Sequence, residues 1–303
     1  MEEVYHIPAM LNETIESLAV RPDGVYVDVT FGGGGHSRAI LRAMDEGEKT
    51  EQKGRLFSFD QDADALRNAI DDGRWMFVHS NFRYLKNWMD YYGVEHIDGL
   101  LADLGVSFHH FDCPERGFSF RFSAPLDMRM NQTAKRTAAD VVNGYSEEEL
   151  TRILWLYGEL KNGRQIARNI CQARTKSPVL RTEDLVAVSR IPAERSKELA
   201  RLFQALRIEV NDELGALREM LLAAKDLLNP GGRIAVLTYH SLEDRLVKNF
   251  FRSGNLEGTI EKDFYGNILT PFEVIEKGRE ASPEEVERNP RARSAKLRVA
   301  ERR

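Results

Sequence analysis

The sequence predicts an α/β fold in which a parallel sheet is interrupted by an all-helical insert. Strand-like and helix-like patterns alternate through about the first hundred residues, and this alternation predicts a parallel sheet with helices on both faces. From about residue 134 to residue 208 only helical patterns occur, after which strands return. The sheet domain is therefore expected at residues 1–108 and 210–303, and the inserted helical domain at residues 109–209.

Turn residues and hydrophobic periodicity set the expected boundaries in the first part of the chain. The segment 47–54 is polar and is expected to be a loop. In this part we expect a short helix at 10–19, strands at 25–31, 55–60, 76–80 and 97–105, and helices at 36–44, 63–70 and 82–92.

The insert and the last part of the chain carry clear helix signals. Ser146 and Glu149 form the pattern of a capping box at the start of a helix in the insert. Ser241 and Asp244 form the same pattern after the fifth expected strand. After the insert we expect a helix at 211–228 that ends at "NPGG", strands at 233–239, 272–277 and 295–301, a helix from 241, and a polar loop at 278–290.

Charge is distributed unevenly along the chain. The net charge is −5. The segment from Asp127 to Glu209 nevertheless has 15 Lys/Arg against 11 Asp/Glu, and Arg288 to Arg303 has seven Lys/Arg and one Glu. Such basic segments are either solvated helix faces or contacts for a polyanionic partner.

The cysteines and the absence of targeting patterns indicate the cellular compartment in which the protein works. Cys113 and Cys171 are far apart and form no CxxC motif, which favours a reducing compartment. The N-terminus lacks the basic and apolar regions of a signal peptide, and no apolar run approaches the length of a membrane span. We therefore expect a soluble, cytoplasmic protein without a membrane partner.

The stretch "DVTFGGGGHS", Asp28 to Ser37, joins the first strand to the next helix. In a parallel sheet, such a junction is a place for ligands, and free amides at a helix start favour an anion. A P-loop is excluded because no Lys follows the glycines, and a GxGxxG dinucleotide motif fails because Ser37 or Arg38 falls at its third glycine. Two interpretations of this glycine stretch remain, a binding site for S-adenosylmethionine and a purely structural turn.

Acidic residues at strand ends extend this pattern. Asp28 could pair with the positive centre of S-adenosylmethionine, and Asp60 could bind a ribose diol, although dinucleotide folds use an acid at the same place. Phe82 follows the third strand, where it either flanks adenine or packs in the core. Asp103 ends the fourth strand, as a ligand-facing carboxylate or a strand-end cap.

Eight motifs occur in a set order along almost the whole chain. They are "DVTFGGGGHS", "FDQD", "LLADLGVS", "RGFSF", "PLDMRM", "FQALRIEVNDEL", "YHSLEDR" and "NPRARSAKLR". Each motif is moderately specific and the ordered set is very specific. Together they closely resemble the bacterial small-subunit ribosomal RNA cytosine-N4 methyltransferase family.

This resemblance implies a class I S-adenosylmethionine-dependent methyltransferase sheet, which is Rossmann-like, with an inserted helical, RNA-binding domain. It implies S-adenosylmethionine as the methyl donor and a cytidine in the decoding region of 16S rRNA as the substrate. By match to the family's motifs, the cofactor-binding residues are Gly34, Gly35, His36, Asp60, Phe82, Asp103 and His110. The segment around His110 departs from the family's usual Ser-x-Gln-like pattern, and Gly33 is often Arg or Ala in the family.

The expected chemistry is transfer of a methyl group to the exocyclic N4 of cytosine. Asp103 is the candidate catalytic residue, because a hydrogen-bond acceptor on N4–H helps to localise the nitrogen lone pair. His240 could contact the target base or a phosphate, although its neighbourhood also reads as a helix cap. Phe108, Phe118 and Phe120 are candidates for stacking on the base.

RNA contact is expected from basic residues in two places. Arg164 and Arg168, with Lys161, share one face of a helix whose other face carries Ile166 and Ile170. Arg291 and Arg293 lie in the basic segment near the C-terminus. The expected partner is 16S rRNA or the small ribosomal subunit, and no DNA partner is expected.

Three alternatives remain beside this interpretation. His109, His110 and Cys113 could form a metal site, but no fourth ligand is evident, so we expect no required metal. The chain could instead be a ribosome-assembly factor that binds the donor without turnover. A nicotinamide oxidoreductase is disfavoured by Ser37 at the position of the final glycine.

Overall fold

The computed structural model describes residues 8–46, 53–106 and 113–303. The chain divides into two compact units, which differ in architecture. The sheet unit comprises Met1–Gly105 and Leu214–Arg303, and the helical unit comprises Val106–Glu213. Among the described residues, no helix is both long enough and apolar enough to cross a membrane.

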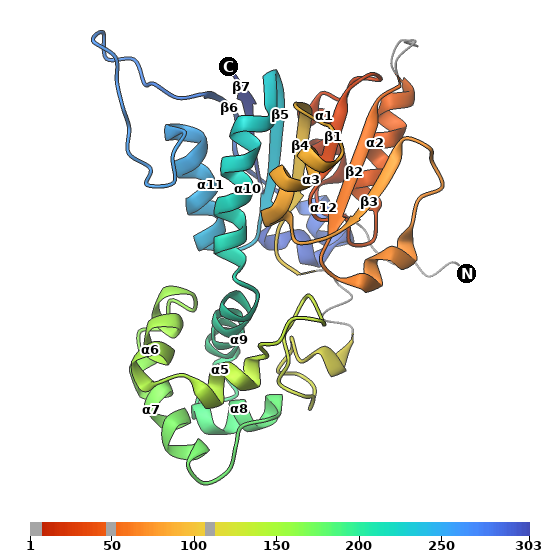
Figure 1. Ribbon diagram of the computed structural model, residues 1–303. Helices are drawn as coiled ribbons and strands as arrows, with labels where there is room; N and C mark the ends of the chain where they lie inside the picture. The colour runs from red at the N-terminus through yellow and green to blue at the C-terminus, as the bar shows by residue number, and fades with distance from the viewer. Residues whose placement is uncertain (1–7, 47–52, 107–112) are drawn as a thin grey trace. The chain divides into compact units, whose positions relative to one another are not determined.

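The sheet unit is built on a seven-stranded sheet in the order β3-β2-β1-β4-β5-β7-β6 (Figure 1). The first five strands are parallel, whereas β7 runs antiparallel to both β5 and β6. The strands are β1 (Val25–Asp28), β2 (Arg55–Asp60), β3 (Trp75–His79), β4 (Ile97–Asp103), β5 (Leu228–Thr238), β6 (Phe272–Glu280) and β7 (Lys296–Arg302).

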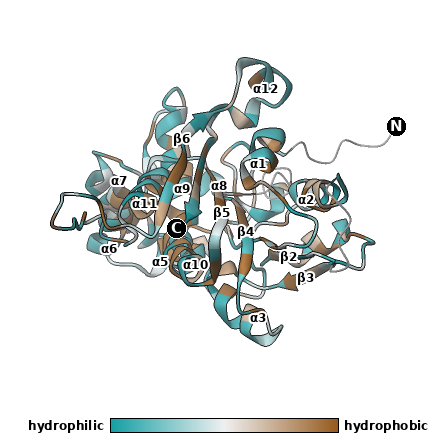
Figure 2. Ribbon diagram, turned by 90° about the horizontal axis from the view of Figure 1, so that it is seen from above, coloured by the Kyte–Doolittle hydropathy of each residue, from teal (hydrophilic) through white to brown (hydrophobic). Residues whose placement is uncertain are grey.

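Helices cover both faces of this sheet, as Figure 2 shows from above. One face packs against α3 (Leu85–Tyr91), α10 (Glu213–Leu227) and α11 (Ser241–Ser253). The other packs against α1 (Leu11–Leu18) and α2 (Gly35–Glu46). The central strands are almost fully buried, as expected for a parallel sheet covered on both faces.

The helical unit contains α5 (Ala138–Gly144), α6 (Glu147–Leu156), α7 (Gly163–Arg174), α8 (Thr182–Ser189) and α9 (Ser196–Asn211). These helices enclose an apolar core of their own. The predicted capping box is confirmed: the Ser146 side chain accepts from the Glu149 amide, and the Glu149 side chain accepts from the Ser146 amide. A second capping box, between Thr137 and Asp140, starts α5.

Two predicted elements differ in type from the structure. Residues 63–70 were expected to be a helix, but only a 3₁₀ helix, η1 (Ala63–Asn68), forms there. It stops where Asn68 bonds elsewhere: its carbonyl accepts from Arg38, and its side chain donates to the Gly32 carbonyl. The predicted loop 278–290 contains a helix, α12 (Pro283–Arg288), which Ser282 caps with Pro283 in its first turn.

The capping box predicted at the start of α11 is also wrong in its residues. His240, not Ser241, is the N-cap, and its partner is Glu243. Asp244 instead receives two hydrogen bonds from the Arg298 guanidinium, at 2.7 and 3.0 Å. Asp244 and Arg298 therefore tie α11 to β7 as an ion pair with the geometry of a bidentate bridge.

Candidate functional site

Three acidic residues end neighbouring strands at one edge of the sheet. Asp28 ends β1, Asp60 ends β2 and Asp103 ends β4. Because these strands are parallel, their carboxyl ends meet at the same edge. The chain order reverses between β1 and β4, which is where open α/β sheets bind ligands.

The glycine turn, residues 32–35, follows β1 and leads directly into α2. Gly32 and Gly34 have φ angles of +49° and +75°, a region that favours glycine. A Cβ at Gly34 would come within 2.9 Å of the Phe31 ring, and one at Gly35 would collide with the Pro8 ring. The backbone conformation and the close packing of this turn therefore both require glycine.

Asp60 holds the glycine turn from the neighbouring strand. Its Oδ2 accepts from the Gly32 amide at 2.8 Å, and its Oδ1 accepts from the Asp62 amide at 2.9 Å. The opposite side of the turn is held by Arg38, which donates to the Gly33 carbonyl at 2.8 Å. The turn is thus preorganised by protein groups on both sides.

Asp28 lies beneath the turn and is fully buried. Its carboxylate accepts from the Ser37 hydroxyl at 2.6 Å and from the Thr30 amide at 3.1 Å. Burial raises the pKa of Asp28 to about 6. In this structure the carboxylate supports both ends of the glycine turn and is not exposed to solvent, unlike the ligand-facing role predicted for it.

Asp103 is held between two side chains at the end of β4. Its Oδ1 accepts from the Tyr239 hydroxyl at 2.6 Å, and its Oδ2 lies 3.7 Å from His36 Nδ1. Its backbone amide donates to Thr30 Oγ1 at 2.7 Å. Burial raises the pKa of Asp103 to about 7, and the negative charges of Asp28 and Glu243 add to the shift.

His36 and Phe82 are both placed at this edge by the elements that precede them. His36 lies in the first turn of α2, is almost fully buried, and has Nε2 3.3 Å from the Ala9 carbonyl. Phe82 follows β3 in a 3₁₀ turn (Phe82–Tyr84) capped by Asn81, and it packs partly against the core. His36 is therefore brought next to Asp103, whereas Phe82 remains at the border of the core.

His240 serves as a helix cap in this structure. Its Nδ1 accepts from the Glu243 amide, and its Nε2 lies 3.1 Å from Glu243 Oε1. Glu243 is buried, and its carboxylate also accepts from the backbone amide of Tyr239 at 2.9 Å. This motif therefore forms a helix cap, as expected, but with His240 and Glu243 in place of the predicted Ser241 and Asp244.

Several other predicted residues lie elsewhere or outside the described residues. Phe108, His109 and His110 fall in the segment that the structure does not describe. Phe118 is buried in the core of the helical unit, so it is not available there for stacking on a base. Phe120 packs edge-on against Phe203, with ring centroids 5.6 Å apart.

The predicted RNA-contacting arginines are exposed. Arg164 and Arg168 lie on the outer face of α7, and Ile166 and Ile170 are buried on its other face. Arg168 also lies 3.6 Å from a Glu147 carboxylate oxygen. Arg291 and Arg293 are exposed on a 3₁₀ helix (Pro290–Ser294).

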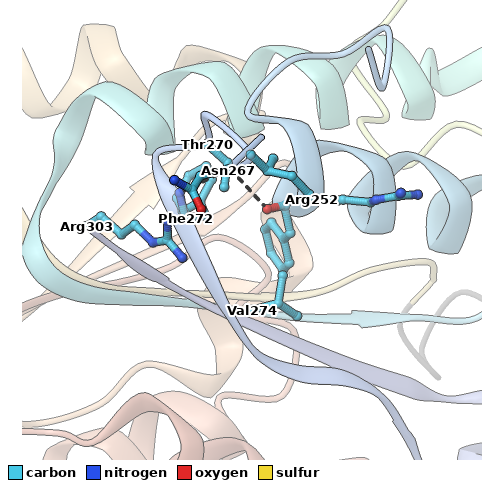
Figure 3. A pocket seen from close by; sticks show the side chains of 8 residues that line it. Arg252, Asn267, Thr270, Phe272, Val274 and Arg303 are labelled. Carbon is cyan, nitrogen blue, oxygen red and sulfur yellow. Dashed lines mark hydrogen bonds between the residues drawn. The ribbon is translucent and has the colours of Figure 1, made fainter. Parts of the chain in front are cut away.

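A separate hollow of about 370 Å³ lies beside β6. It is lined by Phe251, Arg252, Asn267, Ile268, Thr270, Phe272, Val274 and Arg303 (Figure 3). In Figure 3, Thr270 donates a hydrogen bond to the Phe251 carbonyl at the wall of this hollow. None of the predicted site residues lines it, so it is distinct from the site at the glycine turn.

Tyr239, Thr30 and Ser37 are the functional neighbours that the sequence interpretation missed. Tyr239 follows β5, and its hydroxyl bonds Asp103; Thr30 and Ser37 bond Asp103 and Asp28 from the turn. The available signal was position, since Tyr239 directly follows an apolar strand whose carboxyl end meets the same edge of the sheet.

The sheet order, the glycine turn after β1 and the acids that end β2 and β4 define a class I methyltransferase domain of the S-adenosylmethionine-dependent type. The model of the MraW methylase family matches residues 3–303, and the chain belongs to this family.

Curated relatives are similar along their whole lengths. A protein of Phocaeicola vulgatus named ribosomal RNA small subunit methyltransferase H is 56% identical over 306 residues, covering 100% of this chain and 99% of that protein. The protein of the same name from Parabacteroides distasonis is 55% identical over 305 residues, covering 99% and 98%. A solved rRNA methylase from Streptococcus thermophilus is 11% identical, with a TM-score of 0.42 and 98% of each chain covered.

Proposed function

We propose that this protein transfers a methyl group from S-adenosylmethionine to the exocyclic N4 of a cytidine in the decoding region of 16S rRNA. The observation that carries the proposal is the Asp103 carboxylate, held by Tyr239 and adjacent to His36 at the switch point of the sheet. The high identity to relatives named as small-subunit ribosomal RNA methyltransferases supports the choice of RNA.

The residues around the glycine turn fit the donor's chemistry. The turn and the start of α2 offer backbone amides to a carboxylate, as in other helix-start anion sites. Asp60 ends the neighbouring strand, where an acid can bind a ribose diol. S-adenosylmethionine, when bound, supplies an electrophilic methyl group. Gly34, Gly35 and His36 contact the donor, and Phe82 flanks its adenine. His110 stays a predicted contact.

Asp103 acts on the target amine. The cytosine N4 lone pair is delocalised into the ring, so the nitrogen is a poor nucleophile. An ionised carboxylate that accepts the N4–H bond localises electron density on nitrogen and later takes up the proton. Asp28 supports the site by holding Thr30 and Ser37 in place.

The RNA strand is bound through exposed arginines. Arg164, Arg168, Arg291 and Arg293 are the proposed phosphate contacts, because exposed cations on a regular element suit a polyanion. A cytidine in folded RNA must be turned out of its stack before a buried carboxylate can reach its N4. We propose no role for His240 beyond the helix cap and its hold on Glu243.

Membership of a methylase family favours turnover over the alternative of an assembly factor that only binds the donor. Calorimetry with S-adenosylmethionine and with NAD separates the proposal from a nicotinamide-dependent enzyme. Binding of the first ligand but not of the second is expected. Binding of NAD alone would overturn the assignment of the glycine turn.

The proposal is tested in a strain from which the gene has been deleted. Nucleoside mass spectrometry of its 16S rRNA is expected to lose N4-methylcytidine. Expression of this chain should restore the modification, and expression of an Asp103→Asn variant at equal abundance should not. If the modification persists in the deleted strain, another enzyme makes it and the proposed substrate is wrong.

A further inference from the structure

Tyr239 is the residue in direct contact with Asp103 that has no assigned role. Its hydroxyl donates to Asp103 Oδ1 at 2.6 Å, a length typical of a strong bond to a carboxylate. The other oxygen, Oδ2, lies on the side of His36, 3.7 Å from its Nδ1. The two oxygens of Asp103 thus have different surroundings.

The position of Tyr239 is fixed at its backbone. The backbone amide of Tyr239 donates to the buried carboxylate of Glu243 at 2.9 Å. The ring lies on the side of Gly105, where an added Cβ would be 3.5 Å from Tyr239 Cδ2, so a side chain at position 105 would contact it. A side chain fixed in this way can impose its own orientation on the group that it bonds.

We infer that Tyr239 is a positioning residue for the proposed methyl transfer, which fixes the Asp103 carboxylate with Oδ2 directed toward the target amine. This inference rests on the proposed function. A phenol bound to a carboxylate only donates, so it favours the charged form of Asp103. Burial and the nearby acids raise the pKa of Tyr239 well above its usual value, so it keeps its proton.

The groups that face Asp103 come from four elements. Burial raises the pKa of Asp103, the hydrogen bond from Tyr239 after β5 lowers it, and the negative charges of Asp28 from β1 and Glu243 from α11 raise it further. His36 from α2 contributes Nδ1 at 3.7 Å. Of these groups, Tyr239 can be changed by removal of a single oxygen atom while the ring stays in place, which makes Tyr239→Phe a sharp probe.

Tyr239→Phe is expected to lower kcat roughly 10- to 100-fold, the effect of losing a fixed geometry in a site. The KM for S-adenosylmethionine should change less than about threefold, because the phenol bonds Asp103 and not the turn. The acidic limb of the pH–rate profile should move upward by roughly one pH unit, because the bond that lowers the pKa of Asp103 is lost.

Tyr145→Phe is the matched control. The Tyr145 hydroxyl also donates to a carboxylate at 2.6 Å, that of Glu209, but within the helical unit. The acidic limb of the pH–rate profile of this variant should lie at the same pH as in the wild-type protein. If Tyr239→Phe lowers kcat and Tm but does not move the acidic limb of the pH–rate profile, Tyr239 is only structural and the inference is wrong. An unchanged kcat in Tyr239→Phe would also overturn the inference.

A second readout separates this inference from the proposed function. Carbon-13 NMR of labelled aspartate carboxyls titrates Asp103 in the protein without RNA, with Asp103→Asn to assign the signal. The pKa of Asp103 should rise in Tyr239→Phe and stay unchanged in Tyr145→Phe. If the wild-type protein methylates no cytidine, the proposed function fails; if the Asp103 pKa does not respond to Tyr239→Phe, the inference about Tyr239 fails.

Discussion

Asp103 combines a strand-end position, burial and a specific hydrogen-bond donor. These properties make its charge state sensitive to its neighbours, as is common for residues that act on protons. Asp103 has a pKa raised to about 7, so its carboxylate is partly protonated at neutral pH. The rate of methyl transfer should therefore rise as pH increases through about 7, since only the ionised form accepts the N4–H bond.

The Asp103→Asn variant tests this role at the residue scale. The amide keeps the shape of the carboxylate but loses its charge, so turnover is expected to fall about 100-fold or more. Binding of S-adenosylmethionine should weaken far less than turnover, as measured by calorimetry. Full turnover together with unchanged donor affinity would exclude Asp103 as the acceptor of the amine.

The raised pKa of Asp28 leads to a separate prediction about the pH dependence of protein stability. Its pKa is about 6 in the folded protein against 3.8 for an exposed carboxyl, so the folded state holds this proton more tightly. The contribution of the group to stability is therefore full below about pH 4 and is lost as pH rises through about 6. Between about pH 4 and pH 7, the free energy of unfolding of the wild-type protein should fall by roughly 2–3 kcal/mol relative to that of Asp28→Asn.

Denaturant unfolding of both proteins across this pH range measures the difference. Asp72→Asn is the control, because hydrogen bonds from Arg74 lower the pKa of Asp72. The stability of wild type relative to that variant should not decline between about pH 4.5 and pH 7. A constant difference between wild type and Asp28→Asn would show that Asp28 is ionised in the folded protein throughout the range.

At the scale of elements, the glycine turn joins backbone geometry to ligand binding. Gly34 has φ +75°, and a Cβ there would come within 2.9 Å of the Phe31 ring. Gly33 has no such left-handed φ. Gly34→Ala is expected to destabilise the protein by about 1–2 kcal/mol and to weaken S-adenosylmethionine binding at least tenfold. Gly33→Ala should leave both unfolding and calorimetric binding close to wild type, and equal effects of the two changes would contradict this account of the turn.

Elements with strong local signals could be predicted from the sequence. The strand at 55–60 matches β2, and Ser146 and Glu149 form the predicted capping box, since apolar runs and caps act locally. The helix predicted at 63–70 is a 3₁₀ helix that ends at Asn68, which bonds Arg38 and Gly32, two residues distant in sequence. Tertiary hydrogen bonds of this kind leave no periodic pattern in the sequence.

In the candidate site, too, features that depend on local sequence could be predicted, and contacts between distant residues could not. Position at strand ends was enough to single out Asp60 and Asp103. The bond from Tyr239 to Asp103 spans 136 residues and joins strands that become neighbours only in the folded sheet, so the sequence did not reveal it. Arg298 looked like part of a basic segment, yet it is buried and pairs with Asp244.

At the scale of the whole molecule, a protein with net charge −5 has to bind a polyanion through local basic surfaces. Arg164→Glu with Arg168→Glu is expected to weaken RNA binding. It should also reduce the slope of log K against log salt by roughly 0.7 to 0.9 for each phosphate that the variant no longer neutralises. Arg67→Glu with Lys86→Glu, two exposed residues of the sheet unit, is the control and should leave the slope unchanged. A wild-type slope in the α7 variant would remove this helix from the RNA-binding surface.

The central claim is that this sheet edge transfers a methyl group to cytosine N4. The most direct measurement uses small subunits from the deleted strain, the purified protein and S-adenosylmethionine with a deuterated methyl group, followed by nucleoside mass spectrometry. Label is expected in N4-methylcytidine with the wild-type protein, and about 100-fold less label or lower still with Asp103→Asn. Label on carbon 5 of cytosine or on another nucleoside, or equal N4 labelling by the Asp103→Asn variant, would contradict the central claim.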